Sequence, residues 1–212
     1  VIAAKYALTY SEDIDALILS SPGFVPAMEV PAWKKSLAGI LSRYLPSFTM
    51  ATRLDPKGLS RDTAVVDEYE NDRMVHGQVS ARWYTEMIKT AEECMNRAME
   101  IRMPLLVFHG TADKIVDCRG SETFFNNASS VSKELHQLKG FYHETMNDTD
   151  KKLILSIVAK WIGTVIGRKK ASKDAKKTKP AKPIIKTAKK SVAKAANVSL
   201  KKGSPTRGAK NQ

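Results

Sequence analysis

Three short runs rich in apolar residues divide the chain. Two of them, DALILSSP (residues 15–22) and MPLLVFHG (residues 103–110), hold consecutive apolar residues and end at Pro or Gly. Apolar runs without alternation are typical of strands that a parallel sheet buries on both faces. The third run, KELHQLKG (residues 133–140), is more polar, which favours a strand nearer the edge of the sheet.

Apolar residues at helical spacing predict helices around these strands. The segments VIAAKYALTY (1–10) and SETFFNNAS (121–129) are helix candidates, and DKKLILSIVAKWIGTVIG (150–167) predicts an amphipathic closing helix. Alternating helices and strands indicate an α/β fold with helices on both faces of the sheet. Three parallel strands would leave an apolar edge unpaired, and the chain opens at Val1, so we expect the first strands to precede it.

The segment between the first two strands, residues 24–90, has a different texture. Pro, Met, Trp and Leu are scattered among charged residues, which indicates an insert of several short helices with few strand signals. Trp33, Leu37, Ile40 and Tyr44 recur at helical spacing. Core packing is the expectation for such a stripe, and the wall of an apolar ligand pocket is the alternative.

The positive charge is concentrated at the C-terminal end. The formal net charge is +13, but residues 168–212 hold 16 Lys and Arg and one Asp, which leaves 19 basic and 21 acidic residues in 1–167. We therefore expect one domain over residues 1–167 and a disordered basic tail over residues 168–212. The tail resembles cationic linker-histone tails. Its partner would be an anionic membrane surface or another polyanion, without a specific nucleic-acid motif, or it is a silent extension.

Other residue patterns narrow the class of protein. Cys94 and Cys118 are too few for a disulfide framework and fit a reducing compartment, so we expect a cytoplasmic location, with membrane association through the tail as an option. No apolar run is long enough for a membrane span. The sequence has no Cys/His cluster and no Gly-rich phosphate loop, so we expect neither a metal nor a cofactor.

Two titratable residues follow the second and third strands. Asp113 comes three residues after Gly110, and His143 lies in GFYHETMND, just past KELHQLKG. Ligands of α/β sheets bind beyond the carboxyl ends of the strands, and an acid followed by a histidine is the second half of a Ser–Asp–His order. The Asp would orient the imidazole, and the His would move the proton of a nucleophile. Taken alone, Asp113 fits a turn former or helix cap, and His109 at the strand end is expected to be structural.

With these residues in view, the chain resembles a known family. PLLVFHGTADKIVD (104–117), KGFYHETMND (139–148) and a final helix ending in KWIG resemble the monoacylglycerol lipase and lysophospholipase group of α/β-hydrolases, of the serine aminopeptidase S33 type. The segment from Leu59 to Met87 is similar to that group's cap, and residues 1–23 are similar to the segment directly after its nucleophile elbow. The resemblance covers about residues 1–166.

The resemblance implies the C-terminal part of an α/β-hydrolase fold, with Asp113 as the triad acid and His143 as the base. It also implies a nucleophilic Ser in a Gly-x-Ser-x-Gly elbow, a motif that this chain lacks. We therefore expect the nucleophile and part of the oxyanion hole upstream of Val1, and no activity from the given chain alone.

The insert is where this family carries its lid. We expect an apolar wall for an acyl chain from Ile40, Leu41, Leu45, Phe48 and Met50. The expected function is hydrolysis of carboxylic esters through an acyl-enzyme, on a monoacylglycerol or lysophospholipid. The alternatives are an aminopeptidase, a dehalogenase or epoxide hydrolase with an Asp nucleophile, or a non-catalytic protein that binds polyanions through its tail.

Overall fold

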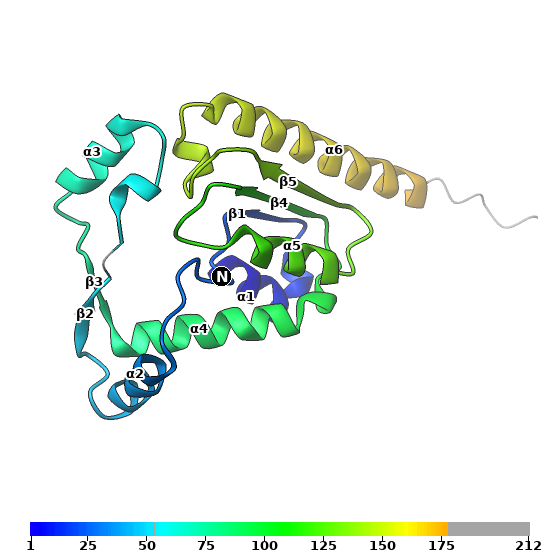
Figure 1. Ribbon diagram of the computed structural model, residues 1–212. Helices are drawn as coiled ribbons and strands as arrows, with labels where there is room; N and C mark the ends of the chain where they lie inside the picture. Colours follow the sequence, from blue (N-terminus) through cyan, green and yellow to red (C-terminus); the bar gives the residue numbers. More distant parts are fainter. Residues whose placement is uncertain (53, 178–212) are drawn as a thin grey trace, which may run out of the picture.

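The structure, a computed structural model, describes residues 1–52 and 54–177 (Figure 1). Its main sheet has three parallel strands in the order β1-β4-β5, which are Leu17–Ser20, Leu105–Gly110 and Lys133–Leu138. The register pairs Leu17 with Leu105, and Leu105 with Lys133. The predicted α/β class is confirmed, and the more polar third strand lies at an end of the strand order, as its composition indicated.

Helices cover both faces of this sheet (Figure 1). On one face lie α1 (Ile2–Thr9), α4 (Ala81–Asn96) and α5 (Cys118–Asn127), and on the other lies α6 (Lys151–Lys177). Leu105 and Val107 of β4 pack into the first core, whereas Leu106 and Phe108 pack with Ile154 of α6 in the second. Because successive side chains of β4 enter opposite cores, its sequence shows no alternation.

The insert between β1 and β4 holds the remaining longer elements. They are α2 (Ala32–Tyr44), β2 (Thr49–Ala51), α3 (Thr63–Asn71) and β3 (Gln78–Ser80). Among the described residues, 3₁₀ turns lie at Ser11–Asp13, Pro56–Gly58, Ala98–Glu100 and Thr145–Asn147. The ribbon of β2 and β3 is antiparallel, with Thr49 opposite Ser80. The sequence did not predict this ribbon, because strands of three residues are too short to show a period.

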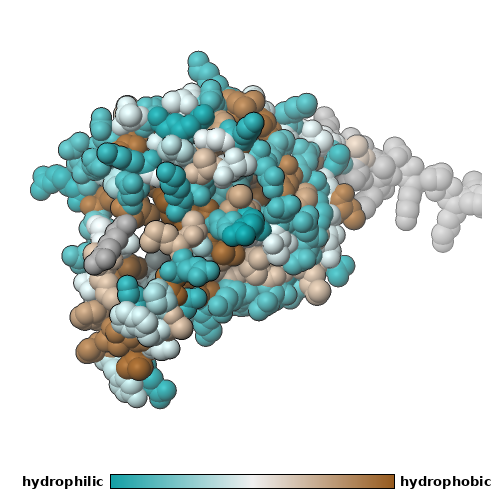
Figure 2. Space-filling model, in the orientation of Figure 1, coloured by the Kyte–Doolittle hydropathy of each residue, from teal (hydrophilic) through white to brown (hydrophobic). Residues whose placement is uncertain are grey.

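The apolar stripe of α2 is exposed, which corrects the expectation of core packing. Trp33 is 64% exposed and Tyr44 is 71% exposed, and Leu37 and Ile40 are also exposed. Apolar surface gathers over this part of the insert in Figure 2. Helical spacing identified the helix correctly, but spacing alone does not say whether another element of the chain covers the stripe.

Helix α6 continues to Lys177, so it extends beyond residue 167 into the first ten residues of the segment predicted to be a disordered tail. The added turns are rich in Lys and Ala, which are strong helix formers and need no core to favour a helix that has already begun. The rest of the predicted tail, residues 178–212, lies outside the described residues. Across the described part of the chain, each helix is too short or too polar to span a bilayer.

Candidate active site

The loop after β4 buries the side chain of Asp113. Its side chain has 0% exposure, and Oδ1 accepts hydrogen bonds from the backbone N–H groups of Ile115 and Val116 at 2.8 and 3.0 Å. These bonds close a turn of the chain around the carboxylate, as an Asp side chain often does at the end of an element. The other oxygen, Oδ2, is left free to face the neighbouring loop.

His143 comes from that neighbouring loop, after β5. Its Nδ1 lies 2.7 Å from Asp113 Oδ2, and its side chain is 25% exposed. Gly140 makes the turn after the strand with φ of +78°, a conformation that a residue with a Cβ adopts only at a cost. Because β4 and β5 are parallel neighbours, their carboxyl ends meet at one edge of the sheet, and the structure brings the two predicted residues together there.

A second imidazole contacts the same carboxylate oxygen. His109 Nε2 lies 3.0 Å from Asp113 Oδ2, and His109 Nδ1 lies 2.6 Å from Ser121 Oγ. Both side chains are fully buried. With Asp113 ionised, both imidazoles donate to it, and the Ser121 hydroxyl then donates to Nδ1 of His109. Sequence reasoning gave His109 a structural role and did not place Ser121 at the site; the spacing of four residues between His109 and Asp113 was the available signal.

The electrostatics of this pair of loops favour a charged Asp113. Burial by itself would raise the pKa of the carboxyl. The hydrogen bonds from His109 and His143, together with the backbone N–H of Val116, outweigh burial and hold the pKa of Asp113 well below its usual range. Asp113 is therefore a hydrogen-bond acceptor at neutral pH, which fixes which nitrogen of His143 carries a proton toward it.

Close packing at Gly110 holds the two loops against each other. A Cβ on Gly110 would lie 2.3 Å from the carbonyl oxygens of both Phe141 and Tyr142. The N–H of Ala112 donates to that carbonyl of Phe141 at 3.0 Å. The end of β4 thus presses directly on the backbone that leads into His143, and only glycine leaves room for it.

The serines in the described part of the chain form no hydrogen bond with His143. Ser20, at the end of β1, lies with Oγ 3.2 Å from Thr145 Oγ1, and the buried Ser21 follows it with φ of +39°. Within the residues that the structure describes, Nε2 of His143 has no hydrogen-bond partner. The described site therefore pairs a buried carboxylate with a partly exposed imidazole, whose Nε2 remains open to a further partner.

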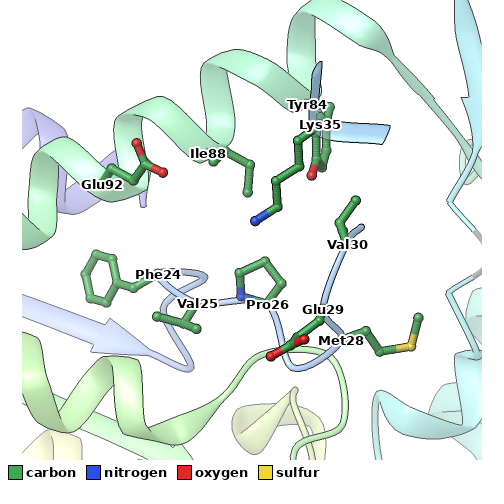
Figure 3. Close-up of a pocket in the computed structure, with 10 residues that line it drawn as sticks. All are labelled: Phe24, Val25, Pro26, Met28, Glu29, Val30, Lys35, Tyr84, Ile88 and Glu92. Carbon is green, nitrogen blue, oxygen red and sulfur yellow. The ribbon is translucent and has the colours of Figure 1, made fainter. Parts of the chain in front are cut away.

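A cavity of about 270 Å³ lies between the start of the insert and helix α4 (Figure 3). It is lined by Phe24, Val25, Pro26, Met28, Glu29, Val30, Lys35, Tyr84, Ile88 and Glu92. Its wall adjoins the Asp113 loop, because Pro26 forms a β-bridge with Val116 and the N–H of Ala27 donates to Ile115 at 3.0 Å. In Figure 3 the side chain of Ile88 points from α4 toward Val25 and Pro26.

The five residues predicted to bind an acyl chain lie elsewhere. None of Ile40, Leu41, Leu45, Phe48 and Met50 lines this cavity. Ile40 is 58% exposed and Phe48 is 47% exposed, whereas Leu41 is half-buried. They form part of the exposed apolar surface over α2 and β2, so their contact with substrate stays a prediction.

Known proteins resemble this chain over the same region. The family described as serine aminopeptidase, S33 matches residues 1–150. A monoacylglycerol lipase of Mycolicibacterium smegmatis is 31% identical over 76% of this chain and 58% of its own length, and a Bacillus subtilis phospholipase is 30% identical over 66% of this chain and 54% of its own length. The crystal structure of the Paleococcus ferrophilus monoacylglycerol lipase superposes with a TM-score of 0.73 at 29% identity, covering 76% of this chain and 63% of that one. The chain thus spans little more than half the length of these two sequence relatives.

Proposed function

Because the chain belongs to the serine aminopeptidase S33 family of α/β-hydrolases, we propose that it supplies the acid and the base of a serine hydrolase that cleaves carboxylic esters. The observation that carries this proposal is the 2.7 Å contact between Asp113 and His143, at the carboxyl ends of β4 and β5. Asp113 holds Nδ1–H of His143, so Nε2 is the nitrogen that accepts a proton. His143 takes the proton of the nucleophile and later gives it to the leaving alcohol.

The nucleophile of this proposal is a serine upstream of Val1, in a Gly-x-Ser-x-Gly elbow. Attack on the ester carbon forms a tetrahedral intermediate, whose collapse expels the alcohol and leaves an acyl-enzyme; water then releases the acid. An elbow Ser also allows a peptidase. An elbow Asp would instead support dehalogenase or epoxide hydrolase chemistry, so the identity of this one residue separates the alternatives.

The substrate that we propose is an ester with one acyl chain, either a monoacylglycerol or a lysophospholipid. The names of the relatives, a monoacylglycerol lipase and a phospholipase, support this choice. We propose that the acyl chain of this substrate contacts five apolar residues of the insert, Ile40, Leu41, Leu45, Phe48 and Met50. Polar substitution of Leu41 or Phe48 is then expected to raise KM for long-chain esters more than for short ones, and equal effects on both would contradict their role.

The basic tail is a second, separate candidate for function. Residues 168–212 carry 16 basic residues and one acidic residue, a charge that suits phosphate-rich surfaces, including anionic membranes. Binding to vesicles with anionic lipid is expected to fall steeply with added salt. Binding that does not depend on salt would contradict this role.

The proposed reaction is tested in the protein expressed with its upstream coding sequence. We expect hydrolysis of monoacylglycerols, and a loss in kcat of about a thousandfold or more in Asp113→Asn and in His143→Ala. The control is Glu12→Gln, an exposed residue of the 3₁₀ turn after α1, which should retain full activity. Unchanged activity in the first two variants would overturn the roles of Asp113 and His143.

A further inference from the structure

One buried piece of the insert, residues 58–62, lies against the loop that carries His143. Gly58, Leu59 and Ser60 are buried, in contrast to the exposed helix α2. The N–H of Glu144 donates to Leu59 at 2.8 Å, and Ser60 Oγ donates to the carbonyl of Asn147 at 2.9 Å. Hydrogen bonds thus join this segment, called here the clamp segment, to the loop directly after His143.

Arg61 of the clamp segment holds both ends of the same loop. Its Nε donates to Asp148 Oδ1 at 2.8 Å, and its Nη2 donates to Asp148 and, at 2.8 Å, to Asp150. Its guanidinium carbon lies 4.2 Å from the centre of the Phe141 ring. Asp148 is fully buried and Phe141 is 5% exposed. Arg61 therefore contacts one buried residue before His143, which is Phe141, and one after it, which is Asp148.

The clamp segment also contacts the loop of Asp113. A side-chain carbon placed on Gly58 would lie 3.6 Å from Ile115, whose N–H donates to Asp113 at 2.8 Å. On the other side, the N–H of His143 points to the carbonyl of Gly58 at 3.5 Å. Gly58 thus sits between the two loops whose side chains form the acid–base pair.

We propose that Arg61 and Asp148 are positioning residues for His143, so that the insert supports the catalytic base. This inference rests on the proposed function of His143. Within the described residues, the imidazole of His143 forms one hydrogen bond, through Nδ1. The position and direction of Nε2 therefore depend on the position of the loop backbone. A displacement of about 1 Å can cost a hundredfold in rate, and supporting contacts of this kind keep a catalytic group in place.

The first test needs no activity. Amide hydrogen exchange is measured on Arg61→Met and on Arg61→Met/Asp148→Asn. The double variant removes both charges of the buried pair and leaves no buried carboxylate without a partner. We expect the amide of Glu144 to exchange at least tenfold faster in both variants, relative to the amide of Val107 in β4, which reports on global unfolding. Unchanged relative protection at Glu144 would overturn the proposal.

Arg97→Met is the matched control. Arg97 also pairs with two carboxylates, Glu93 and Glu100, and its side chain is 34% exposed against 29% for Arg61, but it lies at the end of α4. This control should leave the exchange of Glu144 relative to Val107 unchanged.

The second test uses the protein that includes the upstream nucleophile. We expect kcat to fall tenfold to a hundredfold in Arg61→Met/Asp148→Asn, with KM within twofold of the parent, because the loop moves the base and not the bound substrate. A full kcat in the folded double variant would overturn the proposal. If instead Asp113→Asn retains activity, the proposed function fails, and the exchange test still decides whether the clamp holds the loop.

Discussion

The surroundings of Asp113 and of Asp148 are two regions that bury a carboxylate completely but stabilise its charge in different ways. Asp113 accepts from two imidazoles and two backbone N–H groups, whereas Asp148 accepts from the guanidinium and the backbone N–H of Arg61 and from Thr149. An imidazole can gain or lose a proton near neutral pH, and a guanidinium keeps its charge. The Asp113 region therefore relies on hydrogen bonds from imidazoles, whereas the Asp148 region contains a lasting ion pair with Arg61.

The largest expected loss of stability comes from removing the cation that pairs with Asp148. Arg61→Met leaves a fully buried carboxylate without its cation, and we expect a loss of about 3–5 kcal/mol in the free energy of unfolding, measured with urea. Arg61→Met/Asp148→Asn should recover part of this loss. Arg97→Met should lose less than Arg61→Met, because the side chains of its partners Glu93 and Glu100 keep 36% and 49% exposure, whereas Asp148 has none. Equal losses in the two single variants would show that burial of Asp148 does not matter.

The next largest loss of stability is expected from a substitution that disturbs the Asp113 region without changing a charge. Gly110→Ala drives a Cβ into the carbonyls of Phe141 and Tyr142, and we expect a loss of about 3 kcal/mol, at the upper end of overpacking costs. Gly163→Ala is the control, because the space around Gly163 in α6 is open and alanine favours a helix. A stable Gly110→Ala variant, measured in the same urea titration, would contradict the close contact between the loops.

Lowering the pH should reduce the stability of the protein through protonation of both Asp113 and Asp148. Burial raises the pKa of Asp148, but its hydrogen bonds with Arg61 outweigh burial and leave that pKa, like that of Asp113, below its ordinary value. The stabilisation is present above an ordinary carboxyl pKa of about 4 and is lost as pH falls toward the depressed values, at about 1.4 kcal/mol per pH unit for each carboxylate. Arg61→Met/Asp148→Asn should therefore lose stability less steeply below pH 4. Identical slopes in thermal unfolding would contradict the depressed pKa of Asp148.

The smallest effect concerns the support behind Asp113. Ser121→Ala leaves Nδ1 of the buried His109 without its 2.6 Å partner, and we expect a loss of about 1–2 kcal/mol. Ser156→Ala is the control, since its hydroxyl lies on the exposed side of α6 and bonds only to Leu153. Chemical denaturation compares the two, and equal stabilities would show that the bond between Ser121 and His109 contributes little.

Sequence patterns predicted the strands and the acid–base pair of residues 1–167 because the patterns that identify them are local in the sequence. The runs of DALILSSP and MPLLVFHG gave two buried strands, and the order of Asp113 and His143 along the chain gave the pair that the sheet edge joins. Strand ends in a parallel sheet meet at one edge whatever the loops between them do, so these residues could be placed without knowing the rest.

The contacts that the sequence did not reveal join residues far apart in the chain. Arg61 and Asp148 are separated by 87 positions, and each reads in isolation as a surface charge. The exposure of Trp33 likewise depends on which element covers α2, and no spacing within α2 encodes that. The ribbon of β2 and β3 was not predicted for a different reason: its three-residue strands are too short to show a period.

Helix α4 has a consequence for how the insert can move. Its first turn is capped by Ser80 next to the exposed ribbon, and fourteen residues later Cys94 is fully buried in the core with α1. The helix is about 24 Å long. Its C-terminal end lies in the main core, and at its N-terminal end Ala81 is buried while Trp83 is exposed.

An opening motion of the insert cannot swing this helix without pulling Cys94 out of the core. A motion that leaves α4 in place would have to bend the chain after Phe24 and before Ser80. It would also have to break the 2.7 Å hydrogen bond between Ser42 of α2 and Thr85 of α4, and to bend around the clamp segment, which stays bonded to the loop of His143.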